Sequence, residues 1–174
     1  VIGAGGTVGS QDWVQTALIA QAGGVDPKQM RYVSMEGGGE LATALLGGHI
    51  QVASTDISDS VPHVQSGDMR ILAVLSDKRL EGPIVSDIPT AKEQGFDVTW
   101  PVIRGYYLGP KVSDEAYAWW KNAFDTLLAS EDFAKLRAER QLYPFAMTGD
   151  ELDAYVKKQV ADYKKLASEF GLTK

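Results

Sequence analysis

A strand pattern, a turn of small residues and a helical pattern follow one another three times in the first part of the chain. Units of this kind with short connections are typical of a parallel sheet covered by helices. The strands are predicted at 1–2, 31–34 and 49–53, the turns at 3–10, 36–39 and 54–58, and the helices at 10–22, 40–46 and about 59–66. Ser10 is the predicted N-cap of the first helix, which Gly23 and Gly24 should end. Ligands of such sheets bind at the carboxyl ends of the strands, where these turns fall. The sequence therefore predicts an α/β fold with a ligand site formed by three turns.

The rest of the chain adds two predicted strands and four predicted helices. The strands are Arg70–Leu75, apolar enough for burial on both faces of a sheet, and Arg104–Leu108. The helices are a short one from Pro89 to Gly95, one capped by Ser113, one from Ser130 to about Leu142, and a long one that opens with the capping box of Thr148 and Glu151. The helix after Ser113 carries apolar residues at helical spacing, which we interpret as core: Ala116, Trp120, Phe124 and Leu127.

The composition excludes several classes of protein. The content of 44% hydrophobic and 23% charged residues is typical of a globular protein, and no apolar run approaches the roughly 20 residues of a bilayer-crossing helix. Cysteine is absent, which excludes thiol nucleophiles, disulfides and thiolate metal sites. The net charge of -6 arises from residues 1–100, an acidic segment that is a poor partner for phosphate backbones. We therefore expect no nucleic-acid partner, and we expect an anionic ligand to be held by local dipoles and one or two cations.

The glycine-rich segment Gly3–Ser10 has two interpretations from its residues alone. Backbone N–H groups at a helix start, together with the helix dipole, form a cradle for an anion, and the hydroxyls of Thr7 and Ser10 could add donors. The alternative is a tight turn in which the glycines only supply positive φ angles.

The same segment also imitates a dinucleotide-binding fingerprint. Gly3, Gly5 and Gly9 give the spacing G-x-G-x-x-x-G, and Glu36 follows the next strand, where a ribose-binding acid would lie. The usual third glycine position is occupied by Val8. This pattern makes an NAD(P)- or FAD-dependent α/β enzyme the alternative function.

Catalytic and metal sites have little support in the sequence. His49 starts a strand and His63 lies in a short helix, so neither belongs to a nucleophile elbow or a two-histidine motif, and we expect structural roles for both. No cluster of His, Asp and Glu has metal-ligand spacing. Arg104 is different, because it enters an apolar strand beside Gly105 at the junction of the two parts. Its guanidinium could hold a carboxylate at two points, or it could form a salt bridge.

Several motifs follow one another along the chain. They are Gly3–Ser10, Tyr32–Leu41, Ala44–Ser54, Pro62–Val74, Asp87–Gly95, Arg104–Gly105, the turn at Gly109 and Pro110, and the three terminal helices. In this order and spacing they resemble the solute receptors of tripartite tricarboxylate transporters, the Bug or TctC-like family. The resemblance covers essentially the whole chain.

The resemblance implies a periplasmic binding protein-like (type II) fold, whose two lobes close on a small carboxylate. It also implies a periplasmic protein that performs no chemistry, uses no cofactor, delivers its ligand to the membrane permease subunits and is a monomer when full length. By family order, residues 1–101 form most of the second lobe, and residues 102–174 are the strand and helices that complete the first. The N-terminal part of the first lobe is expected upstream of Val1, so we expect the chain to be truncated there.

The ligand contacts implied by the resemblance are carried over by position. The matching residues are Thr7, Gly9, Ser10, Gly37, Gly38, Ser54, Thr55, Asp56 and Arg104. Where relatives often carry a histidine near the start of the first helix, this chain has Asp12 and Trp13. Asp56 is unexpected beside an anion, and it could bind a ligand ammonium group or cap the loop. The ligand stays open among citrate-like, dicarboxylic, aromatic and amino acids.

A third function shares the two-lobed architecture by analogy of fold alone. The effector-sensing domain of a transcription regulator would need a helix-turn-helix upstream of this segment. The enzyme alternative instead predicts stabilisation by NAD(P) or FAD, whereas a receptor is stabilised by an organic acid.

Arg104 is predicted to contact the ligand carboxylate. Arg104→Ala should weaken carboxylate binding by about 1.5–3 kcal/mol, because a charge-assisted hydrogen bond is lost. Calorimetric titration of the full-length protein measures this loss, and an unchanged affinity would remove Arg104 from the site.

Overall fold

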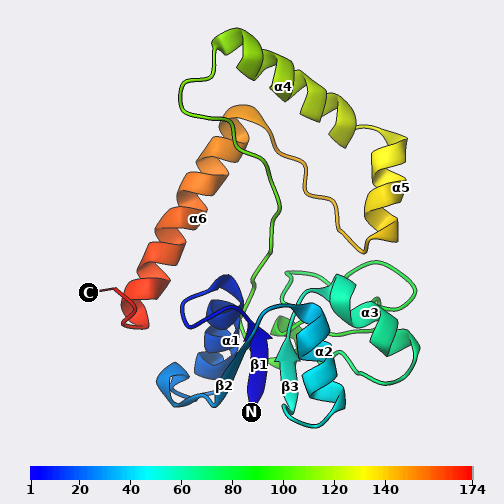
Figure 1. Ribbon diagram of the computed structural model, residues 1–174, viewed down its shortest axis with the longest axis vertical. Coiled ribbons are helices and arrows are strands. Elements are labelled where there is room, and N and C mark those ends of the chain that lie inside the picture. Colours follow the sequence, from blue (N-terminus) through cyan, green and yellow to red (C-terminus); the bar gives the residue numbers. More distant parts are fainter. Residues whose placement is uncertain (174) are drawn as a thin grey trace. The chain divides into compact units, whose positions relative to one another are not determined.

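A three-stranded parallel sheet forms the centre of the first part of the protein. In the computed structural model, which describes residues 1–173, β1 (Ile2–Gly5) lies between β2 (Tyr32–Met35) and β3 (Val52–Ser54) (Figure 1). Both pairs of strands are parallel, with Gly5 opposite Met35 and Ala4 opposite Ser54. The carboxyl ends of the strands therefore meet at one edge of the sheet, which confirms the predicted strand–turn–helix units.

Each strand is followed by a helix. These helices are α1 (Gln11–Ala22), α2 (Gly38–Leu46) and α3 (Ile57–Gln65), with a 3-10 turn, η1 (Pro27–Gln29), between α1 and β2. As predicted, Ser10 caps α1, because its side chain accepts a hydrogen bond from the N–H of Trp13 at 3.2 Å. The same helix ends at Gly23, again as predicted.

The core depends on a close approach of α2 to β1. Leu41 and Ala44 of α2 pack with Ile50 in one buried cluster. A Cβ at Gly3 would lie only 2.5 Å from Cδ1 of Ile50 and 2.8 Å from Cδ1 of Leu41. Glycine at this position therefore lets the two elements pack without moving the core. Other side chains that are fully buried are Ala4, Val14 and Ala17.

The predicted strand Arg70–Leu75 is wrong. Of its residues only Val74 forms a β-bridge, to Thr90, and the N–H of Val74 donates to the carbonyl of Pro89 at 3.1 Å. Proline has no N–H with which to extend a ladder, so the pairing stops at one bridge. The helix predicted to start at Pro89 is reduced to a 3-10 turn, η2 (Lys92–Gln94).

The chain divides into two compact units. The first contains residues 1–101 and the C-terminal residues from Leu166 onward, and the second contains residues 102–165. The helices of the second half are α4 (Asp114–Leu128), α5 (Glu131–Glu139) and α6 (Gly149–Glu169), the last of which ends in the first unit. Ser113 and Ser130 cap α4 and α5 as predicted. None of the helices in residues 1–173 is long and apolar enough to cross a membrane.

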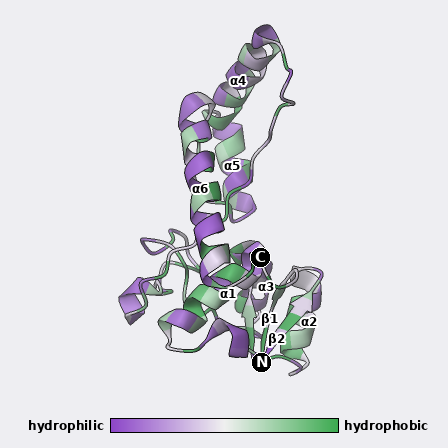
Figure 2. Ribbon diagram, turned by 90° about the vertical axis from the view of Figure 1, so that its left-hand side faces the viewer, coloured by the Kyte–Doolittle hydropathy of each residue, from purple (hydrophilic) through white to green (hydrophobic). Residues whose placement is uncertain are grey.

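The second unit differs from the sequence prediction in two respects. Arg104–Leu108 forms no strand, because no strand in the described part of the chain pairs with it. The apolar face of α4 is also exposed rather than buried, with 43% of Trp120 and 45% of Leu127 accessible. The aromatic rings on this face of α4 contact other rings instead. Phe124 stacks on Trp120, with ring centroids 6.0 Å apart, and on Tyr106, which precedes α4, with centroids 5.4 Å apart. Figure 2 shows hydrophobic and hydrophilic residues alternating along α4, α5 and α6.

A contact between two rings attaches the end of the chain to α1. Trp13 and Phe170 meet edge to face with centroids 5.6 Å apart, and both are buried. Phe170→Ala should lower the free energy of unfolding by about 3 kcal/mol, because it removes a buried ring. Phe96→Ala truncates a ring that is 40% exposed and should cost less than about 1 kcal/mol. Chemical denaturation measures both variants, and equal losses would contradict the packing role of Phe170.

Candidate functional site

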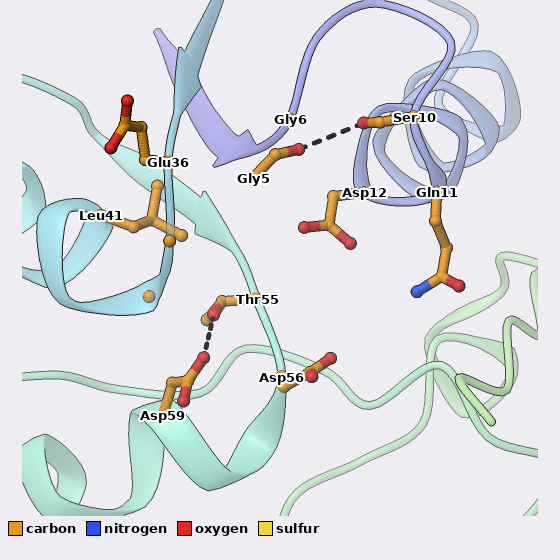
Figure 3. Close-up of a pocket in the computed structure, with 12 residues that line it drawn as sticks. Gly5, Gly6, Ser10, Gln11, Asp12, Glu36, Leu41, Thr55, Asp56 and Asp59 are labelled. Carbon is orange, nitrogen blue, oxygen red and sulfur yellow. Dashed lines mark hydrogen bonds between the residues drawn. The ribbon is translucent and has the colours of Figure 1, made fainter. Parts of the chain in front are cut away.

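A pocket of about 330 Å³ lies at the carboxyl edge of the sheet (Figure 3). Its lining comes from the turn after β1, the start of α1, the turn after β2, and the starts of α2 and α3. Each of the three predicted turns therefore contributes to one pocket, at the place where parallel sheets bind ligands.

Five of the nine residues predicted to contact a ligand line this pocket. They are Ser10, Gly37, Gly38, Thr55 and Asp56. The structure thus brings together residues that are far apart in the sequence, because the three strands that precede them are paired in register.

The other four predicted residues do not line the pocket. Thr7 is exposed in the turn, and Gly9 has a φ of 88°, a left-handed conformation that favours glycine. The hydroxyl of Ser54 accepts a hydrogen bond from Nε2 of Gln15 at 2.7 Å, so it links β3 to α1. Arg104 belongs to the second unit.

The pocket also contains residues to which the sequence analysis gave no ligand-binding role. Gly5 and Gly6 belong to the predicted glycine-rich turn, and Glu36 was considered only as a ribose-binding acid. Asp12 and Asp59 lie in the first turns of α1 and α3, where an acid usually complements the helix dipole. The signal that could have indicated Asp12 and Asp59 is an acid in the first turn of a helix that follows a parallel strand.

Hydroxyl groups hold the glycine-rich turn. Gly6 has a left-handed φ of 69° and its carbonyl accepts hydrogen bonds from Tyr32 Oη at 2.6 Å and from Ser34 Oγ at 2.9 Å. The carbonyl of Gly5 accepts from Ser10 Oγ at 3.1 Å (Figure 3). These bonds fix the direction of two consecutive carbonyls, and with them the wall of the pocket between β1 and α1.

The hydroxyl of Tyr32 keeps its proton under ordinary conditions. Burial raises the pKa of Tyr32 above its ordinary value, and the Asp12 carboxylate raises this pKa further, while a hydrogen bond with Ser10 opposes both effects. The phenol therefore acts as a neutral donor to the turn over the physiological pH range.

Two of the three helices that start at the pocket have no side-chain cap. Ser10 caps α1, but the N-cap of α2 is Gly37, which has no side chain. Asp56 is the N-cap of α3, and its side chain makes no capping hydrogen bond. The capping role considered for Asp56 is therefore not found. The first-turn N–H groups of a helix have no acceptor within the helix, so α2 and α3 present such donors at the pocket.

All the charged side chains that line the pocket are acidic. They are Asp12, Glu36, Asp56 and Asp59. Figure 3 shows the carboxylate of Asp12 pointing into the pocket, whereas that of Glu36 points away from it. Asp59 accepts a hydrogen bond from Thr55 Oγ1 at 3.4 Å, and a Cβ added at Gly38 would collide with its carboxylate. The Asp59 carboxylate thus lies against the start of α2.

The arrangement is suited to non-covalent binding of a small polar molecule. It offers backbone N–H donors from helix starts and carboxylate acceptors from first-turn side chains. Within residues 1–173, no group of three or more His, Cys, Asp or Glu side chains is placed to hold a metal ion. Neither His49 nor His63 lines the pocket.

A family model described as the tripartite tricarboxylate transporter family receptor matches residues 2–172, almost the whole chain. The chain belongs to this receptor family. The resemblance found in the sequence motifs is therefore confirmed.

Relatives with solved structures have the same fold. A TctC solute-binding protein from Polaromonas, solved without ligand, superposes with a TM-score of 0.74 at 21% identity, over 97% of this chain and 57% of that one. A protein of R. palustris, solved with adipate, gives 0.74 at 22% identity, over 98% and 56%. These similarities confirm the predicted α/β fold of the periplasmic binding-protein type.

A relative from Cupriavidus necator, described as "UPF0065 protein in gbd 5'region", is 25% identical over 150 residues. The aligned region covers 84% of this chain and 44% of that protein. The chain spans about half the length of the relatives it matches.

Tyr32→Phe should loosen the glycine-rich turn, because it removes the donor to the Gly6 carbonyl and leaves the ring in place. We expect a loss of about 1 kcal/mol in the free energy of unfolding, the usual contribution of one hydrogen bond. Tyr107→Phe removes a hydroxyl from a side chain that is 79% exposed and should change nothing. Urea denaturation compares the two variants, and a Tyr32→Phe midpoint equal to that of the wild type would show that the turn does not depend on this hydroxyl.

Proposed function

We propose that this receptor captures a small carboxylate in the periplasm and delivers it to the membrane permease subunits of a tripartite tricarboxylate transporter. In this role the protein binds and releases its ligand without changing it, needs no cofactor and acts as a monomer. Family membership supports the receptor role, and the pocket at the strand ends supplies a place for the ligand.

The observation that carries the proposal is the pair of uncapped helix starts at the pocket. Gly37 and Asp56 precede α2 and α3, and neither residue supplies a capping hydrogen bond from its side chain. Helix starts bind anions because unpaired N–H groups and the positive end of the helix dipole point in the same direction. A ligand carboxylate at this place would accept hydrogen bonds from those N–H groups, so no basic side chain is needed to bind it.

The relative solved with adipate supports the same ligand class, since adipate is a small dicarboxylate. Its fold is that of the present chain, although only 22% of the aligned residues are identical. Among carboxylates, the proposal includes dicarboxylic, tricarboxylic, aromatic and amino acids.

We further propose that residues 1–101 belong to one lobe of the receptor and residues 102–174 to the other, as the family order implies. The exposed rings of the second unit support this division, because Tyr106, Trp119 and Trp120 contact other rings and yet remain accessible to solvent. In a receptor of full family length, the remaining elements of that lobe would cover these rings.

Neither alternative function has comparable support. The family match includes the turn from Gly3 to Gly9, so it accounts for these glycines without a nucleotide. The effector-sensing alternative rests on fold analogy alone.

A thermal-shift screen of organic acids against the full-length protein tests the proposed function. A carboxylate present at about 100 times its Kd should add about 2.7 kcal/mol to stability. NAD(P) and FAD are included as the ligands that the enzyme alternative predicts. Stabilisation by a nucleotide and by no acid would overturn the receptor role.

Two adjacent glycines of α2 allow a matched pair of variants. A Cβ at Gly38 would collide with the Asp59 carboxylate, whereas a Cβ at Gly39 would meet nothing within 4 Å. Gly38→Ala should therefore disturb the pocket wall and weaken binding of the acid found in the screen by about tenfold or more, which corresponds to about 1.4 kcal/mol. Gly39→Ala makes the same chemical change and should leave the affinity within about twofold. Calorimetry measures both, and equal affinities would place the ligand away from the start of α2.

A further inference from the structure

The wall of the pocket between β1 and α1 depends on support from elsewhere in the chain. Glycine allows many backbone conformations, so a turn that contains Gly6 and Gly9 does not fix its own shape. The hydroxyls of Tyr32 and Ser34 hold one end of the turn through the Gly6 carbonyl. The other end, where α1 begins, is supported by residues 166–173, which we call the terminal segment.

The terminal segment ends α6 in a Schellman motif. The N–H of Leu172 donates to the carbonyl of Ala167 at 2.8 Å, and the N–H of Gly171 donates to the carbonyl of Ser168 at 3.0 Å. Gly171 has the left-handed φ, 69°, that this motif requires. The backbone that carries Phe170 and Leu172 is therefore fixed by hydrogen bonds of its own.

The terminal segment contacts the α1 side of the pocket wall at two places. Phe170 meets Trp13 of α1 edge to face, with ring centroids 5.6 Å apart, and both rings are buried. A Cβ added at Gly9 would lie 3.5 Å from Cδ1 of Leu172, so the Leu172 side chain lies against the glycine-rich turn. One contact thus reaches the first turn of α1, and the other reaches the turn before it.

Trp13 connects the first contact to the pocket. It directly follows three residues of the lining, Ser10, Gln11 and Asp12. Its N–H donates to Oγ of Ser10 at 3.2 Å, and the same hydroxyl donates to the Gly5 carbonyl at 3.1 Å. A shift of Trp13 would therefore disturb the cap of α1 and a hydrogen bond that orients a carbonyl of the lining.

We propose that the terminal segment positions the α1 wall of the pocket for ligand binding, with Phe170 and Leu172 as the positioning residues. The inference rests on the proposed function, because it concerns the same pocket. Groups that bind a ligand keep their geometry only where the packing behind them is rigid. Since α6 begins in the second unit and ends in the first, the support comes from a helix that both units share.

Such coupling acts in both directions. If the terminal segment raises the affinity for a ligand, the bound ligand stabilises the terminal segment on α1 by the same factor. The N–H of Leu172 should therefore exchange with solvent more slowly when the pocket is occupied, because its bond to Ala167 belongs to the stabilised segment.

Affinity in two variants of the natural full-length protein tests the proposal. Adipate, citrate, L-glutamate and benzoate are titrated calorimetrically, and the acid that binds the wild type most tightly is used for the comparison. Phe170→Ala should weaken its binding about tenfold and Leu172→Ala about threefold, within the range by which packed contacts modulate coupling. Leu172 is 37% exposed, so its truncation leaves the buried ring pair intact and decides the question if Phe170→Ala fails to fold.

A matched variant separates positioning from a loss of stability. Ile88→Ala also truncates a buried apolar side chain of the first unit, but Ile88 does not line the pocket. It should leave the affinity within about twofold of the wild type, because distant and independent sites contribute additively. A purely structural role of Phe170 would give the same result for both variants.

Hydrogen exchange supplies a readout that needs no ligand. In Phe170→Ala, the N–H of Trp13, which bonds to Ser10, should exchange at least about fivefold faster than in Ile88→Ala, because the start of α1 opens locally. The N–H of Leu41, which lies in α2, should exchange at the same rate in both variants.

The outcomes separate this inference from the proposed function. Wild-type affinity in both terminal-segment variants would overturn the inference and leave the carboxylate receptor intact, and so would an equal loss of affinity in Ile88→Ala. If none of the four acids binds the wild type, the proposed function fails, and exchange at Trp13 alone decides the inference. A rate equal to that in Ile88→Ala would then show that the terminal segment does not hold the start of α1.

Discussion

The parallel pairing of β1 with both neighbours is the constraint on which the site depends. Parallel strands need a crossover between them, and α1 and α2 provide it here, so a helix starts beside each strand end. Gly3 allows α2 to pack closely on the sheet, because a side chain at this position would push Ile50 and Leu41 away from it. The glycines of β1 and of the turn after it therefore have two different structural roles. Gly3 brings α2 close to the sheet, and Gly6 turns the chain towards α1 at the pocket.

The features of the fold that could be predicted are those set by local chemistry. Ser10, Ser113 and Ser130 were recognisable as caps, because a side chain that accepts a backbone N–H three residues on is a local interaction. The strands predicted at 70–75 and 104–108 failed for the opposite reason. An apolar run indicates burial, but a strand also needs a partner, and the partner is determined elsewhere in the chain. Likewise, the spacing around Trp120 identifies the apolar face of α4 but not what covers it.

In the site too, residues could be predicted from their sequence position, whereas contacts between helices could not. Ser10, Gly37 and Thr55 follow strand ends, so position in the sequence was enough to place them at the pocket. The contact that Asp59 makes could not be predicted in this way, since it joins α3 to Gly38 of α2. That contact exists only because β3 pairs next to β1, which a single sequence does not state. Thr7 and Ser54 illustrate the converse. Thr7 follows β1 but is exposed outside the pocket lining, and Ser54 ends β3 but bonds to Gln15.

The acidic first turns link helix formation to the shape of the pocket. Asp12 and Asp59 lie where a carboxylate stabilises its own helix through the dipole, so these acids have a structural reason to be present. The sheet then directs the helix starts to one pocket, and their charges accumulate there. A ligand carboxylate attracted by the N–H groups of α2 must therefore approach the carboxylate of Asp59 as well. Glycine at position 38 leaves the room that the Asp59 carboxylate occupies, since a Cβ there would collide with it. The residues that help the helices to form therefore also shape the wall of the pocket.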